Sequence, residues 1–563
     1  MKKTLCHLTD LTTPFVFYGI FAATIIYFGK YPMVINAPLQ ALKDLSFPYP
    51  SWLQYSFLAA LGVAAFVPIL NPFREKNGDY GAAHYANKKE IKKMDLMDPS
   101  GIILGVHQGN YIRTSQPLSV LVYAPPGSGK TAGIIIPSLI SCSHSAVVHD
   151  PKGELYFKTK KRRSEFSKII KFAPGEKDSF KWNPLSKKEL PEDWADKEVH
   201  IGRISETVIP DNPKNPGDHW PTAARDFFMF WALYLVWRDG ETSIPTILKE
   251  PLQTPDIQVA IAEILDGAEN LPERVRLSGN GLIGKPENEF GSIVSTFQTN
   301  LAVFFDERIS KNMSDSDFCT KDLREECTTI YLWIKNSDQT RLKNVVTLFF
   351  ETVTLTMLDH EPYPGEQRVT AYLDEFVRMA RIKELLEMPA IGRSYGFNAI
   401  YVCQSTSQVI GIYGQEGMDQ LKNTCTYHVF FAQNEQKVAE DISKSIGNHT
   451  RTKISHSSSG KGFTKNKSMS KEGVPLILPQ QIMSLKKGRV LICMQNNFET
   501  PVDAKCAFWF KDSAMKPHIQ DVDDEDIAGP NDTTKNEVVE NIQPELIADP
   551  EPENIDPAEP DWA

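Results

Sequence analysis

The stretch that most restricts the fold of this chain is LSVLVYAPPGSGKT, at residues 118–131. Its apolar start suits a buried strand, and Gly127 and Gly129 allow the backbone after it to turn several N–H groups toward one point. A strand, a glycine-rich loop and a helix start together form a phosphate-binding loop. In such a loop Lys130 contacts the β- and γ-phosphates, and the Thr131 hydroxyl binds Mg²⁺. The sequence therefore predicts a site for ATP and Mg²⁺, lined by Ala124, Pro125, Pro126, Gly127, Ser128, Gly129, Lys130 and Thr131.

The loop departs from the usual pattern GxxxxGK[ST] at one position. Ala124 stands where the first glycine is expected. A glycine-rich turn that arose by chance is the alternative to a phosphate-binding loop. The strand before the loop and the apolar segment after it, residues 134–140 with Pro137 inside, favour the phosphate-binding loop.

Two apolar stretches near the N-terminus, residues 11–29 and 52–70, are each long enough to cross a bilayer as a helix. Neither contains a charged residue, and Tyr and Trp lie near their ends. Lys and Arg are concentrated before the first stretch and after the second, which places both chain ends in the cytoplasm. The sequence thus predicts a multi-pass membrane protein. Two buried helices of a soluble protein are the alternative.

The opposite end of the chain is strongly acidic. The whole chain has a net charge of −10, but residues 521–563 alone carry 15 Asp and Glu and one Lys, a net charge of −14. This tail is rich in proline and poor in apolar residues, so we expect it to be disordered. Two roles remain open for it: recruitment of basic protein cargo or adaptors, and simple solubilisation.

The body of the chain has the alternating pattern of a parallel α/β sheet. Three further apolar runs end in polar side chains, at residues 145–150, 369–376 and 397–404. Ligands bind at the carboxyl ends of parallel strands, so we expect the polar groups there to face the nucleotide. They are Asp150, the pair Asp374 and Glu375, and Gln404.

Asp374 and Asp150 are the two candidates for the Mg²⁺ carboxylate. Asp374 has Glu375 beside it, which supplies one carboxylate for the metal and a second to orient and deprotonate the attacking water. Asp150 has no acidic neighbour and is followed by Pro-Lys-Gly, which indicates a turn. We therefore expect Asp374 and Glu375 to act on ATP. A helix cap with a solvated Glu375 is the structural alternative for the pair.

Three other segments have distinct compositions. Residues 190–310 are rich in Trp and Pro and in helix-period patterns, with a strongly apolar helix predicted at residues 225–237, so we expect an inserted helical domain. Residues 158–163, KTKKRR, are basic, which is typical either of a solvated helix face or of DNA contact. Residues 457–462, SSSGKG, are predicted to be a mobile loop.

Taken together, these segments resemble the coupling proteins of type IV secretion systems, the membrane ATPases of bacterial conjugation and effector export. Two N-terminal spans and a helical insert occur in the same order as the segments that carry the resemblance, which covers residues 10–512. Those segments are GDYGAAHYA, APPGSGKT, VVHDPKGEL, YLDEFVRM and IGRSYGFNAIYVCQSTSQV.

The resemblance implies a RecA-like nucleotide-binding domain with an inserted all-α domain, preceded by two transmembrane helices and assembled as a homohexamer. It implies a membrane anchor at 1–72, the nucleotide-binding domain at 73–186 and 326–515, the insert at 187–325 and an acidic disordered tail at 516–563. It also implies catalytic roles for Lys130, Glu375, Arg393 and Gln404. Arg393 would reach the phosphate of a neighbouring subunit, and Gln404 would sense the γ-phosphate. A helix-terminal salt bridge is the alternative for Arg393.

The function implied by the resemblance is that of an ATPase of the bacterial inner membrane. It would recruit substrates and drive them to the secretion channel by ATP hydrolysis. Its partners would be channel components, relaxase or effector proteins, and DNA; the sequence does not choose between DNA and protein cargo. Two other functions remain open: a nucleotide-controlled docking platform without motor activity, and a chromosome-partitioning DNA translocase.

Overall fold

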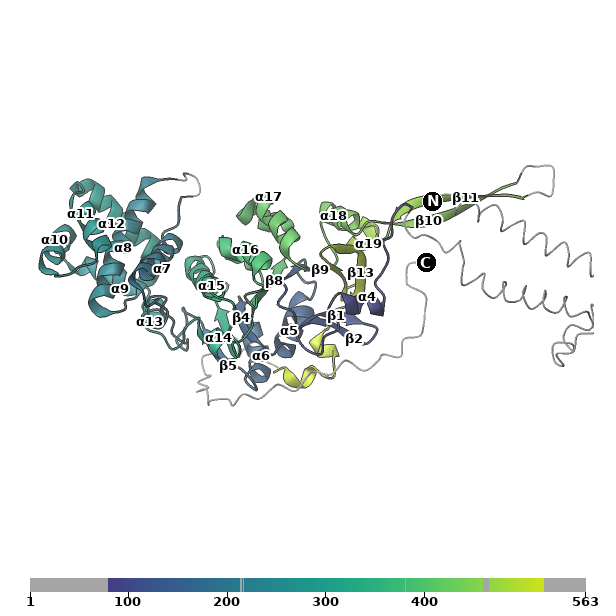
Figure 1. The fold of residues 1–563 in the computed structure, drawn as a ribbon, viewed down its shortest axis with the longest axis horizontal. Helices are drawn as coiled ribbons and strands as arrows, with labels where there is room; N and C mark the ends of the chain where they lie inside the picture. Colours follow the sequence, from purple (N-terminus) through teal and green to yellow (C-terminus); the bar gives the residue numbers. More distant parts are fainter. Residues whose placement is uncertain (1–78, 213–214, 216, 380, 459–464, 521–563) are drawn as a thin grey trace, which may run out of the picture. The chain divides into compact units, whose positions relative to one another are not determined.

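The computed structural model describes residues 79–212, 215, 217–379, 381–458 and 465–520 (Figure 1). Both predicted membrane spans and the acidic tail after Gln520 lie outside these residues. In the described part of the chain, no helix combines the length and the apolar character that a membrane crossing requires. All the described residues belong to the second of the two units into which the chain divides, which begins at Asn77.

The second unit is built on an eleven-stranded mixed sheet with the order β2-β1-β13-β12-β9-β3-β8-β7-β4-β6-β5. Neighbouring strands from β9 to β5 run parallel, as the sequence predicts. The edge made of β12, β13, β1 and β2 is antiparallel. The strands are β1 (Ile102–His107), β2 (Asn110–Thr114), β3 (Val120–Tyr123), β4 (Ser145–Asp150), β5 (Lys168–Phe172), β6 (Thr328–Trp333), β7 (Val369–Leu373), β8 (Phe397–Cys403), β9 (Tyr427–Phe430), β12 (Arg489–Met494) and β13 (Asn497–Lys505).

Helices cover both faces of this sheet, because successive side chains of a strand point to opposite faces. Val120 and Val122 pack in the core that contains α5 and α6, whereas Leu121 and Tyr123 pack in the core that contains α15, α16 and α17 (Figure 1). Strands buried on both faces explain the continuous apolar runs in the sequence. The helices outside the insert are α4 (Lys88–Lys93), α5 (Ile136–Ser141), α6 (Glu154–Arg163), α15 (Lys343–Met357), α16 (Lys383–Ile391), α17 (Thr406–Thr424), α18 (Gln436–Ile446) and α19 (Pro479–Met483).

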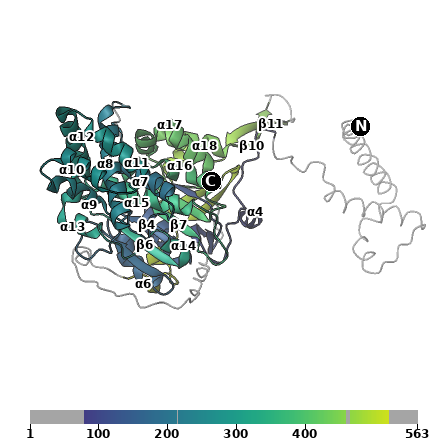
Figure 2. The ribbon, with the colours of Figure 1, turned by 60° about the vertical axis from the view of Figure 1, so that its left-hand side comes forward.

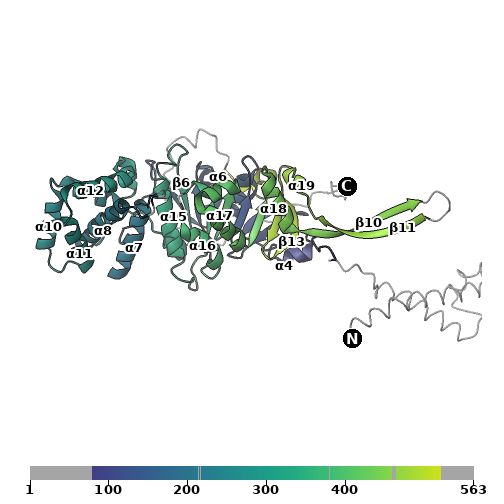
Figure 3. The same cartoon turned by 90° about the horizontal axis from the view of Figure 1, so that it is seen from above.

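The segment between β5 and β6 forms the helical insert, and its helices α7, α8, α10, α11 and α12 stand together in Figure 3. The predicted helix at residues 225–237 is the centre of α8 and is buried on nearly all sides, as its all-round apolar sequence requires. The insert comprises α7 (Trp194–Val208), α8 (His219–Asp239), α9 (Ile244–Lys249), η3 (Pro251–Gln253), α10 (Ile257–Gly267), α11 (Glu273–Ile283), α12 (Glu287–Leu301), η4 (Ala302–Phe305), α13 (Glu307–Asn312) and α14 (Asp322–Glu325).

A long two-stranded hairpin, β10 (Asn448–Ser458) and β11 (Lys465–Pro475), follows α18 (Figure 2). The prediction of a mobile loop at residues 457–462 is wrong at its start, because both residues 457 and 458 pair with β11, and residues 459–464 lie outside the described part. The GDYGAAHYA segment holds the base of this hairpin. Gly81 has a φ of 140°, and a Cβ added there would lie 2.1 Å from the Asn448 carbonyl oxygen. The next residues pair with β10 through Ala82 and His449.

The basic cluster at residues 158–163 is largely structural. Arg163 is fully buried in α6 and donates hydrogen bonds to the carbonyl oxygens of Cys142 and His144. Arg162 is also buried and forms an ion pair with Glu165. Buried guanidinium groups cannot neutralise nucleic-acid phosphates, so Arg162 and Arg163 belong neither to a DNA contact nor to a solvated face. Lys158 and Lys160 are partly exposed and Lys161 is exposed, so both interpretations stay open for the three lysines.

Candidate nucleotide site

The predicted phosphate-binding loop connects β3 to a wide helical turn, η2 (Thr131–Ile135), that continues into α5. Gly127 and Gly129 have φ angles of 75° and 90°, a left-handed conformation that glycine adopts without steric cost. Ala124 is not among the described residues with positive φ, and its N–H donates to the Cys403 carbonyl oxygen at 2.9 Å. Alanine is therefore compatible with the backbone at the position where the usual pattern has its first glycine.

The C-terminal part of the fold packs against this loop. A Cβ added at Gly129 would lie 2.8 Å from Cε1 of Phe508, and one added at Gly133 would lie 2.8 Å from Cβ of Cys506. Gly129 thus serves both the turn and the close approach of the Phe508 ring. No local pattern in the sequence indicates this contact, because nearly four hundred residues separate its partners.

Lys130, Thr131 and Asp374 meet at the carboxyl ends of β3 and β7. The ammonium group of Lys130 forms an ion pair with one carboxylate oxygen of Asp374. The Thr131 hydroxyl donates to the other oxygen at 3.2 Å. Lys130 is 9% exposed and Asp374 is 8% exposed, so little water weakens the attraction between them.

His149 supports Asp374 from the neighbouring strand β4. Its Nδ1 lies 2.8 Å from the backbone carbonyl oxygen of Asp374. Burial lowers the pKa of His149, so the imidazole is neutral and donates its Nδ1–H to that oxygen. His149 was not predicted from the sequence, although its place one residue before the end of an apolar run is a usable signal.

Asp150, the other candidate for the metal, has a different environment. Its carboxylate accepts a hydrogen bond from the backbone N–H of Tyr156 at 2.8 Å, at the start of α6. Burial raises the pKa of Asp150 to about 7, although backbone N–H groups of α6 act in the opposite direction. The side chain of Asp150 therefore binds the backbone of the first turn of α6, whereas that of Asp374 contacts the Thr131 hydroxyl that is expected from the sequence to bind Mg²⁺.

Glu375 is buried in a network at the ends of β7 and β8. The side-chain amide of Gln404 donates to one of its carboxylate oxygens, and Nε of Arg378 lies 2.5 Å from the other. The backbone φ of Glu375 is 64°, which is uncommon for a residue with a side chain, and strained backbone of this kind clusters at functional sites. A solvated Glu375 on a helix cap is thus not observed. Arg378 was missed from the sequence, although it lies in YLDEFVRM.

Arg393 lies where the parallel strands start, at the end opposite to the phosphate-binding loop. It follows α16 and precedes β8, whose seven residues separate it from Gln404 by about 23 Å of strand. Its side chain is exposed and forms no ion pair among the described residues, so the helix-terminal salt bridge is not observed there. All the parallel strands start at the same side of the sheet, and the phosphate-binding loop follows the opposite, carboxyl end of β3. A residue just before β8 therefore cannot reach the phosphate-binding loop of its own subunit.

Comparison with known proteins places this geometry in a family. The model of the family described as type IV secretory system conjugative DNA transfer matches residues 74–530. The chain belongs to this family. It is a type IV coupling protein, and conjugative DNA transfer is the role of its family.

Relatives of this coupling protein are similar over most of its length. The conjugal transfer protein TraG of Escherichia coli is 26% identical over 432 residues, which cover 69% of this chain and 67% of TraG. VirD4 of Agrobacterium fabrum is 24% identical over 415 residues, which cover 72% of this chain and 61% of VirD4.

Solved structures of the conjugative coupling protein TrwB have the same fold. One of them, a complex with sulfate, has a TM-score of 0.54 and 16% identity, and the match covers 75% of this chain and 93% of that chain. Another, a complex with ADP and Mg²⁺, has a TM-score of 0.52 and 16% identity, with coverage of 77% and 97%. The coupling protein therefore shares the mixed α/β fold of these TrwB structures.

Proposed function

We propose that this coupling protein hydrolyses ATP with Mg²⁺ and uses the free energy to move its cargo. One observation carries this proposal: the buried contact of Lys130 and Thr131 with Asp374. An amine for phosphates, a hydroxyl and a carboxylate for Mg²⁺ are the groups that a nucleotide–Mg²⁺ site requires. The complex of TrwB with ADP and Mg²⁺ supports the same cofactors here.

The residues of the loop fit a triphosphate. The Ser128 hydroxyl is buried and has no hydrogen-bond partner among the described residues, so a phosphate oxygen would satisfy it. The left-handed Gly127 and Gly129 leave the loop free of side chains at the two positions nearest the turn. Lys130 would contact the phosphates, and Thr131 and Asp374 would hold Mg²⁺. When bound, Mg·ATP supplies the phosphoanhydride bond that is cleaved.

Glu375 is the residue we assign to proton transfer. Its carboxylate is held by Gln404 on one side and by Arg378 on the other, which fixes its direction. A carboxylate held in this way orients a water molecule and accepts its proton. Because Gln404 contacts Glu375 directly, a change at the γ-phosphate can reach β8 through this hydrogen bond. We therefore propose that Gln404 senses the state of the nucleotide.

Arg393 requires a second subunit for the role that the resemblance implies. It lies far from its own phosphate-binding loop and its side chain is exposed, as a residue that acts across an interface must be. An arginine supplied by a neighbour stabilises the charge of phosphoryl transfer and couples hydrolysis to assembly. We propose a homohexameric ring in which each Arg393 faces the loop of the adjacent subunit.

The proposed location is the bacterial inner membrane, with both chain ends in the cytoplasm. The two uncharged apolar stretches at 11–29 and 52–70 and the distribution of Lys and Arg around them support it. There the protein would receive relaxase-bound DNA or effector proteins and pass them to the channel components.

Replacement of Glu375 by Gln tests motor activity against a docking platform. We expect the ATPase rate to fall by about 10²–10⁴, because the amide cannot accept the proton, and transfer to fall with it. Glu387→Gln, an exposed position on α16, is the matched control and should change neither. Normal transfer by Glu375→Gln with hydrolysis abolished would contradict the motor and favour the platform. A chromosome-partitioning role would instead require DNA movement without any secretion channel.

A further inference from the structure

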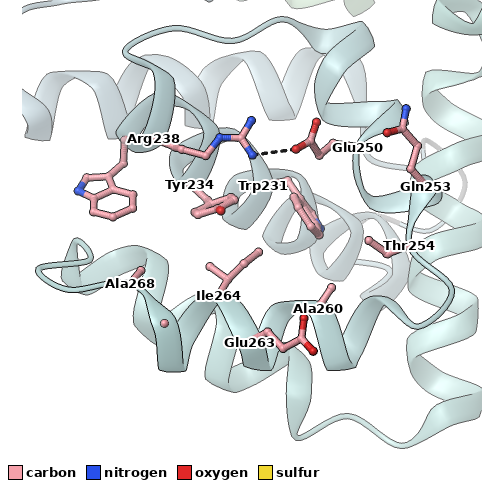
Figure 4. A pocket seen from close by; sticks show the side chains of 12 residues that line it. Trp231, Tyr234, Arg238, Glu250, Gln253, Thr254, Ala260, Glu263, Ile264 and Ala268 are labelled. Atoms are coloured by element: carbon pink, nitrogen blue, oxygen red, sulfur yellow. Dashed lines mark hydrogen bonds and ion pairs between the residues drawn. The ribbon is translucent and has the colours of Figure 1, made fainter.

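The helical insert contains a cavity of about 590 Å³ between the second half of α8, the turn η3 and the helix α10 (Figure 4). Three aromatic side chains of α8 form one wall: Trp231, Tyr234 and Trp237. The rings of Trp231 and Tyr234 meet edge to face with centroids 6.2 Å apart, and those of Tyr234 and Trp237 stack at 6.4 Å. Figure 4 shows Tyr234 and Trp231 facing Ile264 and Ala260 of α10 across the cavity.

The indole N–H of Trp231 in this wall has no hydrogen-bond acceptor among the described residues. The Trp231 side chain is 2% exposed. A buried donor without an acceptor is unfavourable, and buried Trp N–H groups usually find a partner. The position therefore calls for an acceptor from outside the insert, such as a peptide carbonyl oxygen.

The aromatic wall already holds one cation of the chain itself. The guanidinium carbon of Arg238 lies 5.5 Å from the centroid of the Tyr234 ring. Two carboxylates neutralise this guanidinium, Asp239 at 2.6 Å and Glu250 at 2.8 Å. The rim thus has the composition of a cation–π site. The charge of Arg238 is already compensated by the two carboxylates, so it adds no net positive charge to the rim.

The opposite rim of the cavity is acidic. Glu263 of α10 is exposed and forms no ion pair with any described residue. The whole insert, residues 187–325, carries 25 Asp and Glu against 15 Lys and Arg, a net charge of −10. A surface of this sign attracts cations and repels nucleic-acid phosphates.

We propose that this cavity binds an arginine or lysine side chain of a partner protein. The cation lies against Tyr234 and Trp237 and is paired with Glu263, and a backbone carbonyl oxygen beside it accepts from Trp231. A peptide supplies the cation and the acceptor in one molecule, and the volume is within the range of sites that hold small ligands. The inference rests on the proposed function only in that the partner is cargo for transfer.

The test uses the full-length protein in detergent and a fluorescein-labelled peptide of alternating Arg and Gly, with binding followed by anisotropy. We expect Glu263→Lys and Tyr234→Leu each to weaken binding about tenfold, and Trp231→Phe, which keeps an aromatic ring without the N–H, to weaken it several-fold. Asp226→Lys makes the same charge change at an exposed position of α8 outside the cavity, so it should leave the affinity within about twofold.

The ATPase rate of each variant is measured in the same preparation, and it should stay unchanged because only residues of the insert line the cavity, and none of them belongs to the nucleotide site. Equal weakening by Asp226→Lys and Glu263→Lys would overturn the inference, since only the net charge of the insert would then matter. The inference would also be overturned, in favour of DNA, if a single-stranded oligonucleotide displaced the peptide and Tyr234→Leu bound the peptide as tightly as the wild type. Absence of ATPase activity in the wild-type protein would contradict the proposed function instead, whether or not the peptide binds.

Discussion

The ammonium group of Lys130 and the carboxylate of Asp374 form a buried ion pair across 244 positions of sequence. Each neutralises the other where little water is present, so neither can be removed without leaving an uncompensated charge. In the site that we propose, a nucleotide phosphate that bound Lys130 would free Asp374 to hold Mg²⁺ together with Thr131. This exchange of partners links nucleotide binding to metal binding in the site that we propose.

Lys130→Ala is expected to abolish ATPase activity and transfer while the protein stays in the membrane. The substitution removes the phosphate contact and also leaves Asp374 without its ion-pair partner. The measurement is phosphate release by purified protein, together with membrane fractionation. Lys152→Ala is the control, because Lys152 is exposed two residues after Asp150 and should keep the wild-type rate. Hydrolysis at the wild-type rate by Lys130→Ala would show that the loop is not the catalytic site.

Arg393→Ala subunits should regain some activity when they are mixed with Lys130→Ala subunits. Each variant alone lacks one half of every interface, whereas a mixed ring contains some interfaces with both an intact loop and an intact Arg393. The measurement is ATPase rate across mixing ratios. If no ratio gives activity, Arg393 acts within its own subunit or the ring requires all sites. Cross-linking with measurement of the oligomeric state separates these two cases.

Asp150→Asn should keep ATPase activity, whereas Asp374→Asn should lose it, because only Asp374 contacts Thr131 and Lys130. Asparagine at position 150 can still accept the hydrogen bond from the Tyr156 N–H. Phosphate release by the two variants, purified side by side, decides the point. Loss of hydrolysis in Asp150→Asn with a normal melting temperature would reassign the metal to Asp150.

The Asp150→Asn variant also tests how the stability of the fold depends on pH. The pKa of Asp150 is raised from 3.8 to about 7 by burial, so the folded state keeps a proton that the unfolded chain has released. Stability therefore falls as the pH rises from about 4 to about 7, and this loss is complete above it. Asparagine cannot ionise, so the Tm of Asp150→Asn relative to the wild type should be several degrees higher at about pH 8 than at about pH 5. A constant difference would contradict the raised pKa.

Deletion of residues after Gln520 tests the acidic tail. Recruitment predicts a normal ATPase rate with loss of at least one protein cargo, because a segment with a net charge of −14 attracts basic proteins and is repelled by DNA. Transfer of DNA and of each protein cargo is measured beside hydrolysis. Unchanged transfer of every cargo would leave solubilisation as the role of the tail.

Local patterns in the sequence were sufficient for much of the core. The buried strand before APPGSGKT, the strand that ends at Asp150 and the apolar helix around residues 225–237 follow from apolar runs of the right length. The left-handed Gly127 and Gly129 follow from the turn that a phosphate-binding loop requires. The resemblance to coupling proteins, carried by short segments in a fixed order, was confirmed by the family match over residues 74–530.

The tertiary structure decided which of these groups meet, because strand order and the edge at which a strand starts are not written in local periodicity. It placed Asp374 rather than Asp150 against Thr131 and brought His149 and Arg378 to that site. It put Arg393 where the parallel strands start, because a crossover between two parallel strands must return the chain to the start of the next strand. The pairing of residues hundreds of positions apart, Phe508 with Gly129 above all, depends on how the C-terminal segment folds back, and only packing in three dimensions fixes that.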